Sequence, residues 1–373
     1  MKPIYAPLFE PLTFPNGIQL RNRIAVAPMT HYSSNDDGST ADEEFPYVAR
    51  RSRDAGLFLT ACYAVTDNGK AYPGEPLLTS DRFIEKMALL AGIIREQGAV
   101  GIAQLHHGGG VCPPELVPDG DVVSPSAVPT PHRSLITPRG LTPDEVEGIV
   151  RAFGESTRRA IDAGFDGVEI HGAYGYLLQQ FASPYTNRRR DRWADALSFP
   201  LAVLQEVQEV VQRHARGPFL VGYRFTPEEA LDPGLTMDDA LALVEALAEL
   251  KTDFVDVLVN DYRSIPRRAA RAENLSDTRL SLIRRQLSGR AVLLGGGSIF
   301  KAEEGLAALN TGVDVITLGR EMIIDPEWIE KIRTGQESTI VTTLWGAKRD
   351  DLDLPRRFWD TIWSKPGWFP GVA

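Results

Sequence analysis

Residues 141–175 read LTPDEVEGIVRAFGESTRRAIDAGFDGVEIHGAYG, in which one helical pattern is followed by one short apolar run. Thr142 is a favourable N-cap and Pro143 suits the first helical position, so a helix is predicted over Pro143–Ala163. The run Gly167–Ile170 that follows reads as a strand and ends at the polar side chain of His171. Strands that are apolar throughout and are joined by helices are typical of a parallel sheet buried on both faces.

The same unit recurs along the whole chain. Eight short apolar runs are Ile24–Ala27, Leu57–Thr60, Val100–Leu105, Gly167–Ile170, Phe219–Tyr223, Phe254–Val259, Ala291–Leu294 and Val313–Leu318. Helical stretches between them are Arg82–Gln97, Pro143–Ala163, Leu201–His214, Met237–Leu250, Asp277–Leu287 and Lys301–Leu309. Thr236 and Ser276 are further candidate caps. Eight such units favour a closed α/β (β/α)8 TIM barrel over an open doubly wound sheet.

The two ends of the chain add to this barrel. The Asn16-Gly17 pair favours a tight turn, so Leu12–Leu20 is predicted to form a hairpin that caps the barrel. No Pro/Gly/Ser-rich linker divides the chain, so residues 1–340 are expected to form one barrel domain. The tail, residues 341–373, holds four of the six tryptophans, and we expect it to pack on the barrel or at a homodimer interface.

Composition excludes several classes of function. The formal net charge of −10, from 40 basic and 50 acidic residues, argues against binding to nucleic acid or to an anionic membrane surface. No apolar run approaches the roughly 20 residues of a membrane span, and the N-terminus does not resemble a signal peptide. Cys62 and Cys112 are too few for a disulfide framework, although one bridge between them stays open. A cytoplasmic protein that acts on a small molecule is expected.

The last two predicted strands end in glycines, which indicates a phosphate site. Gly295-Gly296-Gly297-Ser298 follows the seventh run and Gly319-Arg320 follows the eighth. Turns on these strands of a barrel offer converging backbone N–H groups, and a guanidinium adds bidentate geometry for phosphate oxygens. The alternative is that the glycines only make a tight turn and that Arg320 pairs with a surface carboxylate.

Other strand ends carry hydrogen-bonding groups suited to a flat heterocycle. The amide of Gln104 can donate and accept at once, and a cation at Arg224 would stabilise negative charge on a reduced ring. His171 precedes Tyr174 by three residues and Tyr176 by five, a spacing that can turn all three toward one mouth. His171 alone could equally be a structural hydrogen-bonder. No metal is expected at His106-His107, because adjacent side chains at a strand end diverge and no carboxylate at ligand spacing accompanies them.

At these residues the chain resembles the Old Yellow Enzyme family of FMN-dependent ene-reductases. The segments that carry the resemblance are Asn22–Ile24, Ala27–Thr30, Ala163–Ala173, Gly175–Leu177, Phe181–Pro184 with Asn187, Gly319–Glu321 and Asp325-Pro326. The bacterial NADH-dependent flavin oxidoreductases are the most similar branch, through Thr30–Ser34 and Asn68–Lys70. The resemblance implies non-covalent FMN, with NADH or NADPH as the electron donor.

It also implies a role for each matched residue. The flavin ring would contact Pro28, Met29, Thr30, Cys62, Gln104 and Arg224, and its phosphate would be held by Gly297, Ser298, Gly319 and Arg320. His171 would hydrogen-bond the carbonyl of an electron-poor alkene, Tyr176 would donate the proton, and Tyr32 would edge the substrate pocket.

The chain departs from the family pattern around the pocket. Tyr174 stands where the family usually has a second His or Asn donor, and the loop before Ser198 is shortened. Tyr174 is expected either to narrow the cavity or to turn away and pack under the loop near Trp193. Three alternatives to alkene reduction therefore stay open: an oxidative or demethylating flavoenzyme, a flavin-binding protein without ene-reductase activity, and a flavin-free phosphate-binding lyase.

Overall fold

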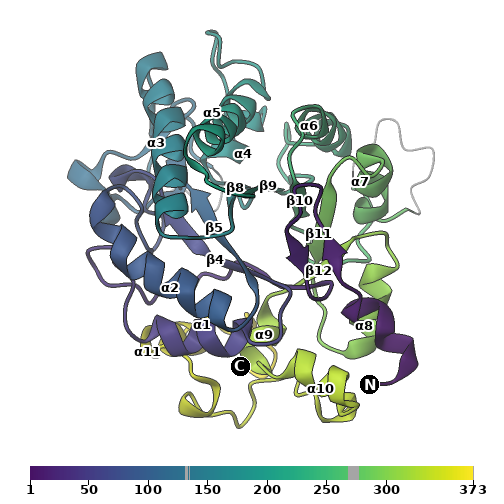
Figure 1. Ribbon diagram of the computed structural model, residues 1–373. Coiled ribbons are helices and arrows are strands. Elements are labelled where there is room, and N and C mark those ends of the chain that lie inside the picture. Colours follow the sequence, from purple (N-terminus) through teal and green to yellow (C-terminus); the bar gives the residue numbers. More distant parts are fainter. Residues whose placement is uncertain (131–132, 134, 268–276, 373) are drawn as a thin grey trace.

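The computed structural model describes residues 1–130, 133, 135–267 and 277–372, and its centre is a closed barrel of eight parallel strands (Figure 1). In chain order the strands are β3 (Ile24–Val26), β4 (Leu57–Ala64), β5 (Val100–His106), β8 (Gly167–Gly172), β9 (Leu220–Phe225), β10 (Phe254–Val257), β11 (Val292–Gly296) and β12 (Val315–Leu318). β12 pairs with β3 and closes the ring. Each of the eight predicted runs overlaps one strand, so the predicted (β/α)8 barrel is confirmed.

Helices surround the barrel. Seven helices connect consecutive strands of the barrel, and these are α1 (Glu44–Ser52), α2 (Ile84–Glu96), α3 (Pro143–Asp162), α5 (Ser198–His214), α6 (Met237–Glu249), α7 (Arg279–Leu287) and α8 (Ala302–Leu309). Four shorter helices are α4 (Leu177–Ala182), α9 (Arg320–Ile324), α10 (Trp328–Thr334) and α11 (Arg356–Trp363). The expected caps Thr142 and Thr236 both form capping boxes. No helix in the described ranges is long and apolar enough to cross a membrane.

The predicted start and cap of α7 were wrong. The expected cap, Ser276, lies outside the described residues, and α7 begins two residues later than predicted, at Arg279. Thr278 is the cap, since its backbone is extended and its hydroxyl accepts a hydrogen bond from the Ser281 amide. Ser276 and Thr278 are both favourable cap residues in the sequence, so the sequence alone does not distinguish between these two starts.

The N-terminal hairpin closes the lower end of the barrel, as predicted. β1 (Leu12–Thr13) and β2 (Gln19–Leu20) pair antiparallel around the Asn16-Gly17 turn, where Gly17 has a φ of +94°. Phe14 is buried against Phe254 at the start of β10, with ring centroids 6.3 Å apart. Because this end is plugged, the barrel can open only at the carboxyl ends of its strands.

The C-terminal tail packs against the outside of the barrel and then reaches its open end. Phe358 of α11 is fully buried and meets Tyr47 of α1 with ring centroids 6.1 Å apart, which places α11 beside α1 (Figure 1). Beyond α11 the chain turns back, and Trp368 contacts the ring of Tyr32 in the loop after β3. The tail therefore contributes both to the core and to the edge of the barrel mouth. Cys62 and Cys112 are both buried and free, so the bridge that the sequence left open is absent.

Candidate active site

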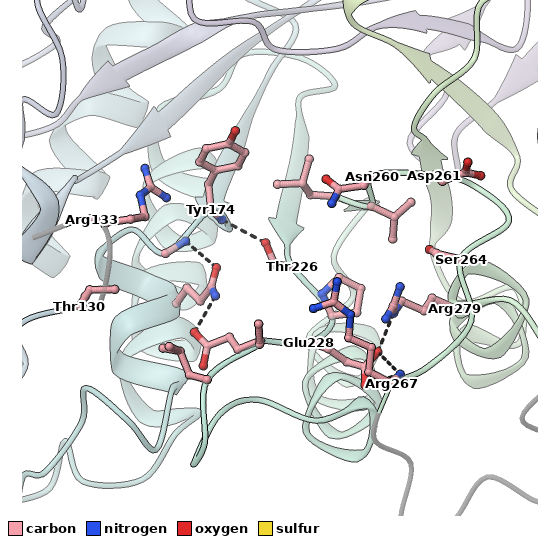
Figure 2. Close-up of a pocket in the computed structure, with 18 residues that line it drawn as sticks. Thr130, Arg133, Tyr174, Thr226, Glu228, Asn260, Asp261, Ser264, Arg267 and Arg279 are labelled. Atoms are coloured by element: carbon pink, nitrogen blue, oxygen red, sulfur yellow. Dashed lines mark hydrogen bonds and ion pairs between the residues drawn. The ribbon is translucent and has the colours of Figure 1, made fainter. Parts of the chain in front are cut away.

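Three adjoining cavities occupy the carboxyl ends of the strands. The mouth cavity, of about 460 Å³, lies over β3, β4, β5 and β8, and the glycine cavity, of about 490 Å³, lies over β10, β11 and β12. An outer cavity of about 410 Å³ opens beside them (Figure 2). Tyr174 and Leu258 line all three, so the cavities form one continuous site of the size that cofactor-binding pockets have.

Every residue that the sequence singled out lines the mouth cavity or the glycine cavity. The mouth cavity holds Pro28, Met29, Thr30, Tyr32, Cys62, Gln104, His171, Tyr174, Tyr176 and Arg224. The glycine cavity holds Gly297, Ser298, Gly319 and Arg320. The barrel brings them together because parallel strands deliver all their carboxyl ends to one edge.

The glycine cavity depends on two positions where a side chain would not fit, Gly297 and Gly319. Gly297 has a φ of +107°, and a Cβ there would overlap the carbonyl oxygen of Val259. A Cβ at Gly319 would come within 2.9 Å of the Met29 sulfur. Side chains at these positions would fill the cradle, so the glycines keep backbone exposed to whatever occupies it.

Arg320 points its charge into the same cavity. Its guanidinium donates to the Ser298 hydroxyl at 3.3 Å and to the Trp368 carbonyl at 3.5 Å, and no carboxylate in the described residues lies within ion-pair distance of it. The one acid that lines this cavity, Glu321, is held neutral, because burial and then the nearby Asp325 raise its pKa to about 9. The expected alternative for Arg320, a surface carboxylate partner, is therefore not seen.

The floor of the mouth cavity rests on a buried polar cluster. Gln104 donates to Glu169 with Nε2 and Oε2 2.5 Å apart, and Arg224 Nε lies 3.1 Å from Asp256 Oδ2. Burial, reinforced by Asp256, raises the pKa of Glu169 to about 8. Burial also raises the pKa of Asp256, and the nearby Arg224 opposes that rise. The Glu169 contact fixes which way the Gln104 amide points.

Three aromatic donors stand above this floor, at the end of β8 and before α4. His171 and Tyr176 have ring centroids 5.4 Å apart, and Tyr174 stacks on Tyr176 at 6.1 Å. Burial, with Arg224 adding to it, lowers the pKa of His171 well below its usual value, so its imidazole is neutral. Burial raises the pKa of Tyr176 well above its usual value, so its phenol keeps its proton. Both groups are therefore hydrogen-bond donors at neutral pH.

A model of the NADH:flavin oxidoreductase / NADH oxidase family matches residues 7–339. The chain belongs to this family. The probable NADH-dependent flavin oxidoreductase YqiG of Bacillus subtilis is 46% identical over 374 residues, covering 99% of both chains. Among solved structures, morphinone reductase in complex with tetrahydroNAD is 27% identical with a TM-score of 0.74, covering 88% of this chain and 91% of that one. The old yellow enzyme of Trypanosoma cruzi is 25% identical with the same TM-score, covering 89% and 93%.

As a flavin oxidoreductase of this family, the protein uses FMN with NADH or NADPH, and its two inner cavities fit that cofactor. The glycine cradle, the unpaired guanidinium of Arg320 and the neutral Glu321 suit a single phosphate. Gln104 and Arg224 offer an amide edge and a cation at the depth where a flat ring would lie. The flavin-free alternative is excluded by the family.

Two other features of the oxidoreductase correct sequence expectations. His106 has a carboxylate neighbour after all, because the loop after β4 brings Glu75 Oε1 to within 2.5 Å of His106 Nε2 in a fully buried contact. Cys62, Glu75 and His106 lie close enough together to be considered as metal ligands. Burial raises the pKa of the Cys62 thiol far above the usual value, which disfavours the thiolate that would bind a metal. His106 and Glu75 already contact each other directly. Tyr174 does not pack under the loop near Trp193, since it is 57% exposed at the junction of the cavities.

Sequence reasoning missed six of the described residues that line the oxidoreductase's mouth cavity. Two of them, Ala71 and Tyr72, lie in the loop after β4. Arg133 comes from the long segment between β5 and α3, Leu258 follows the end of β10, and Lys365 and Trp368 come from the tail. The tryptophan-rich tail and the long irregular segment were the available signals. Nothing in the sequence says where such segments fold back, so only the tertiary structure assigns these residues to the mouth.

Proposed function

We propose that this flavin oxidoreductase reduces electron-poor alkenes, namely α,β-unsaturated carbonyl or nitro compounds. The observation that carries the proposal is the convergence of a neutral His171 and a protonated Tyr176 in one cavity above the Gln104–Arg224 floor. Alkene reduction needs one hydrogen-bond donor to polarise the activating group and a second donor to protonate carbon. The neutral imidazole of His171 suits the first task, and the protonated phenol of Tyr176 suits the second.

Arg320, the glycine cradle and the Gln104–Arg224 floor would hold FMN, which would supply the hydride chemistry between NADH or NADPH and the β-carbon of the alkene. His171 holds the activating oxygen of the alkene by hydrogen bonding, with Tyr174 as the neighbouring second donor. The imidazole donates without itself being charged, so it stabilises the oxygen as negative charge develops there. Tyr176 gives its phenolic proton to the α-carbon and recovers one from solvent.

Arg224 has a separate task in this scheme. Its Nε faces Asp256, and the guanidinium lines both inner cavities. A cation at this depth favours accumulation of negative charge on the ring that lies against it, which supports reduction by NAD(P)H.

The test is to reduce the purified protein anaerobically with NADH and with NADPH, and then to add enones, maleimides and nitroalkenes. Rapid bleaching of the flavin followed by alkene-dependent recovery of its absorbance is the expected result. Bleaching without recovery by any alkene would support an oxidative or demethylating enzyme on the same barrel. A flavin that neither nucleotide reduces would mean a binding protein and would overturn the proposal.

A further inference from the structure

The mouth cavity is cationic, although the protein as a whole is acidic. Arg133, Arg224 and Lys365 line it, and no Asp or Glu is among its described lining residues. The chain carries a formal net charge of −10. The outer cavity, by contrast, mixes arginines with Glu228, Glu229 and Asp261 (Figure 2). A cavity of one sign in a protein of the opposite sign focuses ligands of matching charge.

Arg133 lies at the border between the mouth and outer cavities, beside Tyr174 (Figure 2). Its guanidinium carbon is 4.9 Å from the ring centroid of Tyr174 and 5.1 Å from that of Tyr176. No carboxylate within the described ranges pairs with it. The aromatic faces hold the cation in place and leave its charge unneutralised.

Lys365 is the other cation of the mouth cavity that has no carboxylate partner in the described residues, and it comes from the C-terminal tail. Its Nζ donates to the Tyr32 hydroxyl at 2.8 Å and lies 5.0 Å from the ring centroid of Trp368. Both rim cations are therefore held by neutral aromatic groups.

Arg224 differs from the two rim cations. It is buried on the floor, where it faces Asp256 at 3.1 Å and lies at the depth assigned to the flavin ring. With FMN on that floor, Arg133 and Lys365 are the cations that an entering substrate meets. Arg133 contacts the ring of Tyr176 and Lys365 contacts Tyr32, so both cations lie beside the two tyrosines and not on the Gln104–Arg224 floor.

We infer that the alkene substrate carries a carboxylate in addition to its activating carbonyl, and that Arg133 and Lys365 bind this carboxylate. The inference rests on the proposed function and names its substrate class. His171 takes the carbonyl, and Arg133, which lies over the ring of Tyr176, takes the carboxylate on the same side of the cavity. A charge-assisted contact of this kind changes affinity about tenfold or more.

The reaction leaves the carboxylate unchanged. The carbon–carbon π bond is lost and two C–H bonds form, one from hydride that originates in NADH or NADPH and one from the Tyr176 proton. The nucleotide is oxidised by two electrons, the alkene is reduced by two, and Tyr176 regains its proton from water. The rim cations take no part in these bond changes, so they determine specificity only.

The phosphates of NADH present the same anionic chemistry, and the experiment separates them from a substrate carboxylate. The probes are (E)-4-oxopent-2-enoate and its methyl ester as oxidants, and 4-oxopentanoate and its methyl ester as ligands that cannot be reduced. Calorimetry on the oxidised holoenzyme measures ligand affinity without turnover. Stopped flow measures reduction by NADH and reoxidation by each oxidant separately.

The variants are Arg133→Gln, Lys365→Gln and the double variant, with Arg133→Lys retaining the charge. Arg151→Gln is the matched control, because Arg151 is an exposed arginine on α3, outside the three cavities. We expect the acid to bind about tenfold more tightly than the ester in the wild type. Each Gln variant should remove most of that preference, and Arg133→Lys should retain part of it. Arg151→Gln should change neither the preference nor the rate of reduction by NADH by more than about twofold.

Equal affinity for acid and ester, or equal weakening of both by the Gln variants, would overturn the inference. So would slower reduction by NADH with acid binding unchanged, since the cations would then serve the nucleotide. A third outcome separates the two hypotheses: neither oxidant restores the flavin absorbance, but 4-oxopentanoate binding still depends on Arg133. In that case the proposed alkene reduction is wrong, and the carboxylate site at Arg133 and Lys365 is confirmed.

Discussion

Replacement of Arg320 by alanine tests the phosphate site most directly. The Arg320 guanidinium donates two hydrogen bonds, at 3.3 Å to the Ser298 hydroxyl and at 3.5 Å to the Trp368 carbonyl, and it lies 5.3 Å from the ring centroid of Phe300. Both are long for hydrogen bonds, so their loss should lower the free energy of unfolding by about 1 kcal/mol or less. The folded protein should therefore survive the change with its cradle of glycines intact.

The expected effect on FMN is larger. A hydrogen bond between a charged donor and a phosphate contributes about 1.5–3 kcal/mol, and each 1.4 kcal/mol is about a factor of ten in affinity. The dissociation constant for FMN should rise about tenfold to a hundredfold in Arg320→Ala. Arg320→Lys keeps the charge but loses the bidentate geometry of the guanidinium. Its dissociation constant for FMN should therefore lie between those of the wild type and Arg320→Ala.

The assay is titration of the apoprotein with FMN and with riboflavin, followed by quenching of flavin fluorescence. Riboflavin lacks the phosphate, so its affinity should be nearly the same in the wild type and in Arg320→Ala. An FMN affinity within about twofold of the wild type, or an equal loss for FMN and riboflavin, would show that Arg320 is not the phosphate ligand.

Three further predictions concern the donors. His171→Ala should slow the alkene half-reaction by about 10²–10³ and leave FMN content unchanged, because one oxyanion donor contributes about 2.7–4 kcal/mol; an unchanged stopped-flow rate would move the carbonyl to another donor. Because burial raises the pKa of Tyr176, its proton-donating form persists as pH rises, and the alkene half-reaction should stay level to about pH 9. Tyr176→Phe should slow that step at all pH values, whereas a wild-type decline centred near about pH 7 would exclude this donor. Tyr174→His should raise kcat/KM for a cyclic enone relative to a linear one, since the smaller imidazole opens the junction of the cavities; a constant ratio would show that Tyr174 does not gate entry.

Local sequence features predicted the framework with small errors at its ends. Thr142 and Thr236 cap helices because the signal for a cap lies within four residues of chain. α5 begins at Ser198, before Pro200, although the prediction began after it; proline is tolerated in a first turn, where its missing N–H has no partner to lose. α1, over Glu44–Ser52, was not predicted.

The residues at the strand ends were predictable for a topological reason. Once eight parallel strands close into a barrel, Gln104, His171 and Arg320 must meet, whatever the loops between them do. Their states were not predictable. The neutral imidazole of His171 and the raised pKa of Glu169 come from burial beside Arg224 and Asp256, which lie on strands far away in the chain.

By itself the amino-acid sequence determined the barrel, the hairpin that plugs it and the residues that face its open end, because periodicity, caps and strand order are written locally. Only the tertiary structure decided which residues of the tail and of the long loops surround that end. The tail carries Lys365 and Trp368 back across more than 300 residues to Tyr32, and the segment before α3 lays Arg133 over Tyr176. These contacts depend on how the tail and the long segment before α3 pack against the barrel, and not on a local sequence pattern. The positive charge of the mouth cavity could therefore not be predicted from the sequence.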